Sequence, residues 1–300
     1  MPAPLPALNL VAGPGQRRAT LELAREIERR GFAGISISSQ YSNMSQCLGL
    51  AFATEQIPFA TAIAPIHAAT AEEFADYLHE VSGGRFQFGI GVAHGPAHQR
   101  MGVTPGRPLA DIRDFVAKVR SFDGIGALPP IILAALRRRM VALAAEIADG
   151  LLFANAARSH TAASLGILPA DKCSDPDFFI GNRIRTCVSD DESEAKAVLR
   201  RTVSNYALMP NYRNYWKEAG YAEEMTSIEN VLAAGRTDEI EKYLPDRWLA
   251  DIALFGPAAK IRDGVEAWRD AGIRTPVLVP LSADGDPRTA LQQVFAAFAD

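Results

Sequence analysis

The chain has 300 residues, of which 48% are hydrophobic and 22% charged, and its formal net charge is −4. A chain of this length could form one large domain or two medium ones, and the negative charge argues against a nucleic-acid-binding surface. No apolar run approaches the roughly 20 residues of a membrane span, and the proline-broken start of the chain lacks the basic segment of a signal peptide.

The cysteines indicate the redox environment that the protein is built for. Cys47, Cys173 and Cys187 are odd in number, scattered, and show no CxxC spacing. This pattern predicts neither a disulfide scaffold nor a structural zinc site, and it fits a reducing compartment. We therefore expect a cytoplasmic protein that acts on a small molecule, with neither nucleic acid nor membrane as a partner.

Short apolar strands alternate with amphipathic helices along almost the whole chain. In the first helix, Leu21, Ala24 and Ile27 share one face, and Gly31 follows as a C-terminal cap. Strands are expected at residues 8–13, 32–38, 59–66, 86–91, 130–135, 150–155, 183–189 and 276–281. Helices are expected at residues 17–30, 45–55, 71–81, 109–122, 138–148 and 287–298.

This alternation predicts parallel βαβ units, and the number of strands favours an α/β chain folded as a (β/α)8 TIM barrel. A doubly wound sheet is the second choice. One domain is expected over residues 1–300, with insertions at about 159–178 and 195–255. The second insertion is expected to be a helical excursion between strands seven and eight, at the carboxyl face where barrel active sites form.

The fourth strand carries two glycines, Gly89 and Gly91, between alternating apolar residues. A glycine weakens a strand unless another backbone or a flat ligand must approach closely. Because Ala93 and His94 follow at the strand's carboxyl end, one interpretation is a cofactor lying there. The other interpretation is a core strand that uses small residues for tight packing.

Three segments carry a family resemblance. They are GRFQFGIGVAHG at 84–95, PPIILAALRRRMVALAAEIADGLLF at 129–153 and ALFGPAAKIRDGVEAWRDAGIRTPVL at 253–278. Together they resemble blocks of the luciferase-like monooxygenase superfamily, especially its branch that uses the deazaflavin coenzyme F420. The resemblance covers nearly the whole chain.

The resemblance implies that the cofactor ring lies at the carboxyl mouth of the barrel. In the family a bulge with a non-prolyl cis peptide at the end of strand three supports the ring, and the matching residues are Ala62, Ile63 and Ala64. Ala93, just past strand four, is expected beside the same ligand. Asn155, at the end of strand six, is expected to contact the phosphate or the ring.

The resemblance also implies that backbone amides after strand five hold the cofactor phosphate at a helix N-terminus. The matching residues are Ala135, Leu136, Arg137 and Arg138, where the family usually has Gly-Pro near the two arginines. Either the arginines add charge-assisted contacts to an anion, or the missing glycine blocks close approach and leaves a solvated helix start. Since arginines at a helix N-terminus oppose its dipole, an anionic partner is the better explanation.

The catalytic residues depart from the family pattern. The Asp-His pair of some F420-dependent members falls on Ser39 and Gln40, and Gln40 cannot act as an acid or base near neutral pH. We expect Gln40 to orient the substrate, with Tyr41 as a weaker contact. His94 is the expected proton donor or acceptor, and its alternative role is an ordinary surface histidine.

No metal site is expected. His94 and His98 have HxxxH spacing, but Gly95 and Pro96 between them make a helical arrangement improbable, and no carboxylate completes the set. His67, at the mouth of strand three, is a further residue that could face the pocket.

The resulting hypothesis is an oxidoreductase that transfers a hydride between coenzyme F420 and an unidentified organic substrate. One alternative is an FMN-dependent monooxygenase that uses reduced flavin and O2. Another is a non-catalytic barrel that binds a flavin or deazaflavin, which Gln40 and the missing Gly-Pro would favour. A homodimer formed through flanking helices such as 45–55 is an open expectation.

Overall fold

The computed structural model describes residues 4–11, 13–38, 42–67, 71–93, 95–104, 106–122 and 126–299, with the side chains of all except 71–74 and 96. The chain divides into two compact units. Unit 1 comprises Met1–Ala154 and Leu165–Gly181, and unit 2 comprises Asn155–Ser164 and Asn182–Asp300.

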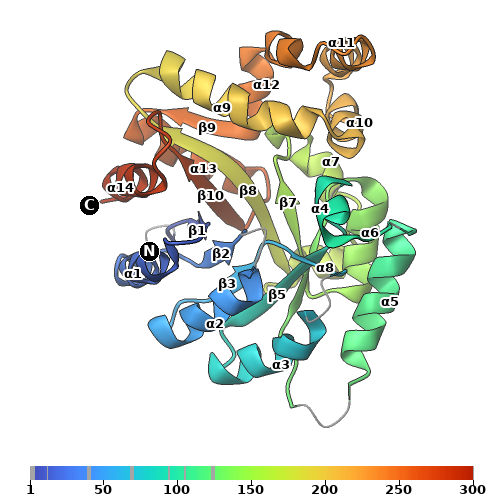
Figure 1. The fold of residues 1–300 in the computed structure, drawn as a ribbon, viewed down its shortest axis with the longest axis vertical. Coiled ribbons are helices and arrows are strands. Elements are labelled where there is room, and N and C mark those ends of the chain that lie inside the picture. The colour runs from blue at the N-terminus through green and yellow to red at the C-terminus, as the bar shows by residue number, and fades with distance from the viewer. Residues whose placement is uncertain are drawn as a thin grey trace. The chain divides into compact units, whose positions relative to one another are not determined.

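Unit 1 is a parallel sheet with helices between its strands (Figure 1). Its strands are β1 Ala7–Leu10, β2 Ile35–Ile37, β3 Phe59–Thr61, β4 Ala64–Pro65, β5 Phe86–Gly91, β6 Ile131–Ala134 and β7 Gly150–Ala154. They follow the order β1-β2-β3-β5-β6-β7, with β4 paired to β5. Leu8, Ile35, Phe59 and Phe86 stand in one row across four of these strands.

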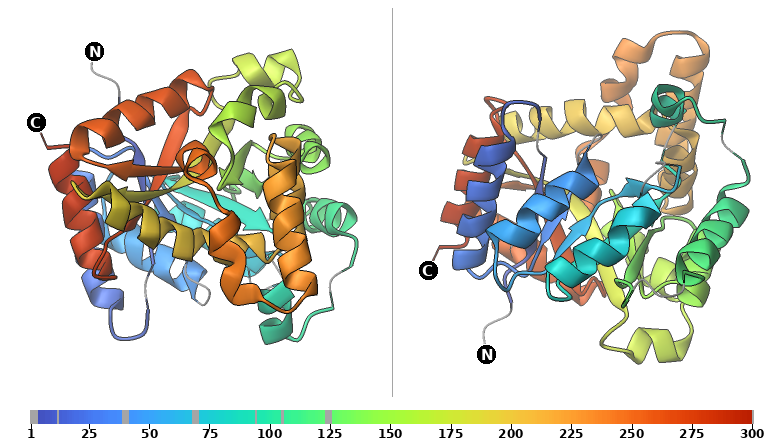
Figure 2. Two further views of the ribbon diagram at one scale, coloured as in Figure 1. Left: turned by 90° about the horizontal axis from the view of Figure 1, so that it is seen from above. Right: turned by 60° about the horizontal axis from the view of Figure 1, so that its bottom comes forward.

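The helices of unit 1 follow its strands in the chain. They are α1 Arg17–Arg29, α2 Asn43–Ala53, α3 Ala71–Val81, α4 Gly95–Met101, α5 Pro108–Arg120, α6 Arg138–Ile147 and α8 Ala170–Ser174. Figure 2 shows α1, α2 and α3 side by side in chain order. Helix α1 forms because its apolar residues recur at helical spacing, and it buries Ala24 and Ile27.

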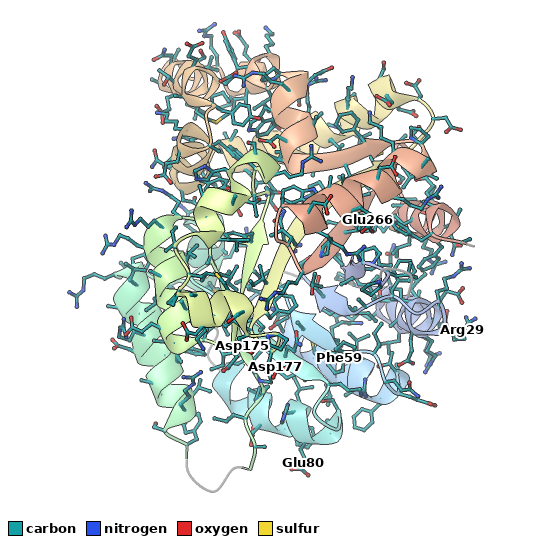
Figure 3. All side chains as sticks on the ribbon, turned by 180° about the vertical axis from the view of Figure 1, so that it is seen from behind. Arg29, Phe59, Glu80, Asp175, Asp177 and Glu266 are labelled. Atoms are coloured by element: carbon teal, nitrogen blue, oxygen red, sulfur yellow. The ribbon has the colours of Figure 1, made fainter. Side chains whose placement is uncertain are left out.

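Strand β5 separates two environments in unit 1. Phe86 and Phe88 are fully buried, and the ring of Phe88 lies 6.2 Å from that of Phe115 on α5. This face of the strand is therefore covered by helices, while Gly89 and Gly91 stand on the other face, since strand residues alternate. Figure 3 shows Phe59 inside the unit, whereas Arg29 and Glu80 project outward.

The remaining elements belong mostly to unit 2. Its helical segments are η1 Arg158–His160, α7 Thr161–Leu165, α9 Glu192–Ala207, α10 Pro210–Glu218, α11 Ala222–Ala233, η2 Thr237–Tyr243, α12 Asp246–Ile252, α13 Ala258–Asp270 and α14 Pro287–Ala297. Its strands are β8 Phe179–Val188, which begins in unit 1, β9 Ala253–Gly256 and β10 Thr275–Leu281. Both β9 and β10 pair with β8.

The expected strands and helices are present, and their ends agree within a few residues except at the start of β8. Three expectations are corrected. The strand expected at 59–66 is interrupted at residues 62–63 and forms β3 and β4. The helical excursion expected at 195–255 ends in a strand, because Ala253, Leu254 and Phe255 pair in register with β8, a run too short to recognise as a strand beforehand.

The third correction concerns the segment after β5. Gly95 and Pro96, which were expected to prevent a helix, instead occupy the first turn of α4. The missing N–H of a proline costs nothing at this position, because the first amides of a helix have no partner within it. The connection expected at 159–178 likewise contains short helices. In the described ranges, no helix has both the length and the apolar character needed to cross a membrane.

Candidate functional site

The centre of unit 1 holds a bulge between β3 and β4. The peptide bond between Ala62 and Ile63 is cis, as the resemblance predicted for this position. The amide of Ala62 donates to the Ile37 carbonyl at 2.7 Å, and the Ile63 carbonyl accepts from Nδ2 of Asn43 at 2.9 Å. Since Asn43 opens α2, the bulge is fastened to both β2 and the helix that follows β2.

The two glycines of β5 make room for this bulge. A Cβ at Gly89 would lie 1.8 Å from the carbonyl oxygen of Thr61, whose hydroxyl donates to the Gly89 carbonyl at 2.7 Å. A Cβ at Gly91 would lie 3.2 Å from Ile63 and 3.1 Å from Cβ of Ala134. The structure therefore supports the second interpretation of these glycines, tight packing, because the backbone of Thr61 and the side chains of Ile63 and Ala134 lie where a Cβ would be.

The segment after β5 brings two histidines together. His67, which follows β4, meets His98 of α4 edge to face, with ring centroids 5.5 Å apart. His98 is buried, and its Nε2 hydrogen-bonds the Val92 carbonyl. Ala93 adopts a left-handed backbone conformation with φ 61° and is half-buried. His94 lies outside the described residues, as do Ser39, Gln40 and Tyr41.

The loop from β6 to α6 offers a positively charged helix start. Ala135 is buried and its amide already donates to the Leu152 carbonyl at 3.1 Å, so this amide is engaged in the sheet and not turned toward a phosphate. Leu136 is half-buried. Arg137 and Arg138 are exposed at the start of α6, and the first turn of that helix carries no acidic side chain. An anion would find both backbone amides and guanidinium groups there.

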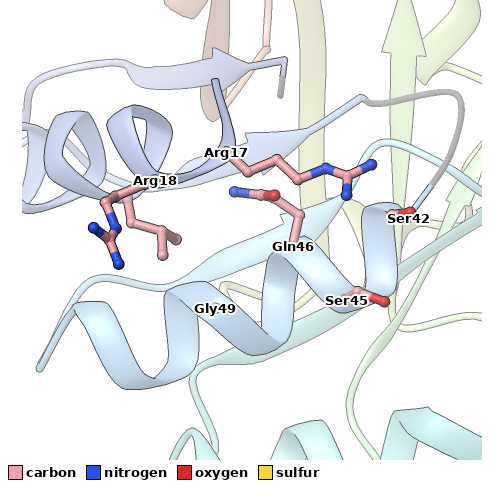
Figure 4. Close-up of a pocket in the computed structure, with 7 residues that line it drawn as sticks. Arg17, Arg18, Ser42, Ser45, Gln46 and Gly49 are labelled. Atoms are coloured by element: carbon pink, nitrogen blue, oxygen red, sulfur yellow. The ribbon is translucent and has the colours of Figure 1, made fainter. Parts of the chain in front are cut away.

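A shallow pocket of unit 1 lies between α1 and α2 (Figure 4). It sits at the starts of the two helices that follow β1 and β2, hence on the carboxyl side of these strands. Ser42, before α2, has φ 61° and makes no side-chain cap to the helix. The residues lining the pocket are Arg17, Arg18, Leu21, Ser42, Ser45, Gln46 and Gly49.

Asn155 directly follows β7 and belongs to unit 2. It is 2% exposed and has φ 53°, a conformation that asparagine tolerates better than most residues. Its backbone amide donates to the Arg183 carbonyl, and its backbone carbonyl accepts from Nε1 of Trp216, each at 3.1 Å. Its side chain lies beside the phenols of Tyr206 and Tyr212. Its contact with a cofactor stays a prediction.

Two arginines of β8 complete this part of unit 2, and the sequence reasoning did not single them out. Arg185 hydrogen-bonds the Tyr206 hydroxyl and places its guanidinium 5.2 Å from the ring centre. Burial and the charge of Arg185 lower the pKa of Arg183 to about 10. Burial alone would raise the pKa of Tyr206, but the charges of Arg185 and Arg183 lower it. The available signal was the RIR sequence, which puts two arginines on one face of a strand.

Asp149, which directly precedes β7, joins β6 to the start of β8. Its side chain accepts from the Ile131 amide at 2.8 Å, and its backbone bonds both Ile131 and Phe179. In the described part of the chain, no group of three or more His, Cys, Asp or Glu side chains is arranged to hold a metal ion.

Comparison with known proteins places this geometry in a family. A Mycobacterium tuberculosis protein named "Putative coenzyme F420-dependent oxidoreductase Rv3520c" is 26% identical over 255 residues, which cover 69% of this chain and 73% of that protein. The F420-dependent tetrahydromethanopterin reductase of Methanopyrus kandleri superposes with a TM-score of 0.77 at 16% identity, covering 97% of each chain. An F420-dependent secondary alcohol dehydrogenase, in complex with an F420–acetone adduct, gives a TM-score of 0.71 at 16% identity, covering 99% and 100%.

These structural matches show the fold: the chain is an α/β protein folded as a (β/α)8 TIM barrel, as predicted. The model of the family described as luciferase-like monooxygenase matches residues 6–122 and 118–275. The chain belongs to the luciferase-like monooxygenase family.

Proposed function

We propose that this luciferase-like oxidoreductase transfers a hydride between coenzyme F420 and an organic substrate. The observation that carries the proposal is the bulge between β3 and β4, at the position where the family supports its cofactor ring, with the Ile63 carbonyl held by Asn43. The relative named for coenzyme F420 supports the choice of a deazaflavin. Bound F420 would supply the hydride chemistry, while the protein positions the ring and the substrate.

The residues of unit 1 suit such a cofactor. Ala62, Ile63 and Ala64 present a small-residue bulge whose Ile63 carbonyl is held in place by Asn43. Arg137 and Arg138 would bind an anionic phosphate at the start of α6, together with amides of that first turn. Ala135 would contribute through its position next to the turn, because its amide is already bonded.

The chemical roles proposed for the loop residues follow from their side chains. His94 would donate or accept the proton that accompanies hydride transfer, since imidazole is the side chain whose charge changes near neutral pH. Gln40 would orient the substrate through hydrogen bonds, because its amide has no acid–base function. Ala93 would border the ring after β5.

We expect His94→Ala to lower kcat by about 100-fold or more, in line with loss of a general acid or base, while the Kd for F420 changes little. Steady-state turnover and a binding titration of the same preparation measure the two quantities. The matched control is His79→Ala, at the end of α3 that leads into the amino end of β5. Unchanged turnover of His94→Ala would remove His94 from the mechanism.

A reduced-FMN monooxygenase is the second candidate, favoured by the description of the matching family as luciferase-like monooxygenase. The two chemistries differ because a deazaflavin lacks the ring nitrogen that permits facile hydroperoxide formation. A barrel that binds a flavin or deazaflavin without catalysing a reaction is the third candidate.

Cofactor co-purification tests the proposal. The protein is expressed in a host that makes both F420 and FMN, purified, and denatured, and the released chromophore is identified by its absorbance spectrum and mass. We expect F420. Release of FMN alone would favour the monooxygenase and overturn the proposal, and bound F420 without turnover would leave the non-catalytic barrel.

A further inference from the structure

Unit 2 contains a group of side chains that all end in hydrogen-bond donors, here called the donor cluster. Its members are Asn155, Arg183, Arg185, Tyr206 and Tyr212. They come from the end of β7, from β8, and from the helices α9 and α10. Segments far apart in the chain therefore meet within unit 2.

The two arginines hold like charges close together. Arg183 and Arg185 are two residues apart on β8, so they stand on the same face of the strand. Their proximity is evident in the pKa of Arg183, which is lowered first by burial and then by the charge of Arg185. Both side chains are half-buried, and so remain within reach of a small ligand. Like charges in a partly buried place attract an anion.

The tyrosines and the asparagine extend this donor set. The rings of Tyr206 and Tyr212 meet edge to face, with centroids 5.0 Å apart. The side-chain amide of Asn155 lies beside both phenols, and within the described ranges its Nδ2 has no hydrogen-bond partner although the residue is 2% exposed. A buried amide hydrogen without an acceptor costs free energy unless something supplies the acceptor.

We infer that the donor cluster binds an oxyanion group, a carboxylate or a phosphate, of a small organic ligand. Such a group offers acceptor oxygens to the guanidinium of Arg185 and to Nδ2 of Asn155. The phenol of Tyr206 adds a further donor once its proton is in place. The inference goes beyond the proposed function, because it needs only residues of unit 2; it assigns Asn155, which was expected beside the cofactor, to a separate small ligand.

The test is calorimetric titration of the cofactor-free protein with inorganic phosphate and, separately, with benzoate, which distinguishes the two kinds of oxyanion. We expect one of the two probes to bind. In Asn155→Asp, the new carboxylate would occupy the place of the anion while keeping the size and the backbone preference of asparagine. Binding should then weaken by about tenfold or more, the effect of losing one charge-assisted contact.

Two further variants keep the result interpretable. Arg236→Gln lowers the net charge of the protein by one, as Asn155→Asp does, but at an exposed ion pair with Glu239. It should leave binding within about twofold, because exposed charges at a distance are screened. Tyr206→Phe removes only one hydroxyl, and should weaken binding even if Asn155→Asp fails to fold. Thermal unfolding of each variant checks that the variant is folded. The inference is overturned if neither probe binds, if Tyr206→Phe and folded Asn155→Asp bind as the wild type does, or if Arg236→Gln weakens binding equally.

Discussion

Arg85, directly before β5, has a structural role. Its guanidinium donates to the carbonyls of Ala51 and Thr54 and to the Thr54 hydroxyl at 2.8–3.1 Å, and it lies 5.3 Å from the ring centre of Phe59. These contacts tie the end of α2 to the start of β5. A guanidinium is suited to this because it presents five donors in a fixed plane.

We expect Arg85→Ala to lower the free energy of unfolding by about 3–5 kcal/mol, since several buried carbonyls lose their donor at once. Urea denaturation measures the change. Arg29→Ala, on the exposed side of α1, is the control and should cost no more than about 1 kcal/mol. Equal losses in the two variants would contradict the structural role of Arg85.

Asn43 is the residue through which the role of the bulge between β3 and β4 can be tested. Asn43→Ala removes the donor to the Ile63 carbonyl, and we expect the affinity for F420 to fall about threefold to tenfold, the effect of one hydrogen bond. Fluorescence titration gives the Kd. The control Asn230→Ala, exposed on α11, should bind like the wild type. An unchanged Kd in Asn43→Ala would mean that the bulge does not contribute to cofactor binding.

Individual site residues could be predicted from the sequence where they match a family motif, and not where they have no such counterpart. Ala62 and Ile63 were predicted because a motif position matched. Asn43 and the members of the donor cluster other than Asn155 were not, because their roles depend on contacts between segments far apart in the chain, and a lone Asn or Tyr has no distinguishing pattern. Arg183 and Arg185 were visible only as an unusual pair within an expected strand.

The contact between β3 and β5 is the element-scale feature most sensitive to change. We expect Gly89→Ala to destabilise the protein by more than about 3 kcal/mol, because the added Cβ would meet a backbone carbonyl that cannot move without disturbing the bulge. Thermal or urea unfolding measures the loss. Gly13→Ala, where a Cβ meets nothing within 4 Å, is the matched control. A Gly89→Ala protein as stable as the control would show that the bulge is placed elsewhere.

The carboxylate of Glu28 joins α1 to the loop before β3. It accepts from the amides of Glu55, Gln56 and Ile57 at 2.7–2.9 Å. Burial alone would raise the pKa of Glu28, but these backbone bonds and the charge of Arg85 lower it. A lowered pKa in the folded state means that the stabilisation is present above the unfolded pKa and is lost as the pH falls through the folded pKa.

We therefore expect Glu28→Gln to lower the free energy of unfolding at neutral pH by about 1–3 kcal/mol, the effect of bonds to a charged group. The difference from the wild type should shrink as the pH falls below the ordinary carboxyl pKa. Urea denaturation across pH measures both proteins, with Glu22→Gln on the exposed side of α1 as control. A difference that grows in acid would contradict this account.

Most elements could be predicted because apolar periodicity is strong in parallel strands and flanking helices. The failures have local causes. β9 has only three apolar residues before its glycine. The strand expected at 59–66 is divided into β3 and β4 by a bulge that periodicity cannot show. α4 begins with Gly-Pro, which suggests a loop unless its position in the first helical turn is known.

For the whole molecule, the barrel followed from the repeated alternation of strand and helix, and the structural matches confirm it. The identity of the cofactor could not be predicted as specifically as the fold. F420 and FMN present similar ring systems, so a small-residue bulge and a cationic helix start suit both. The substrate could not be predicted, because the insertion expected at the carboxyl face of the barrel carries no readable motif.

We propose that this barrel binds a deazaflavin in preference to a flavin. A fluorescence titration of the cofactor-free protein with oxidised F420 and, in parallel, with FMN measures both affinities. We expect F420 to bind at least about tenfold more tightly, a difference of roughly 1.4 kcal/mol. Tight binding of FMN with no measurable affinity for F420 would contradict it.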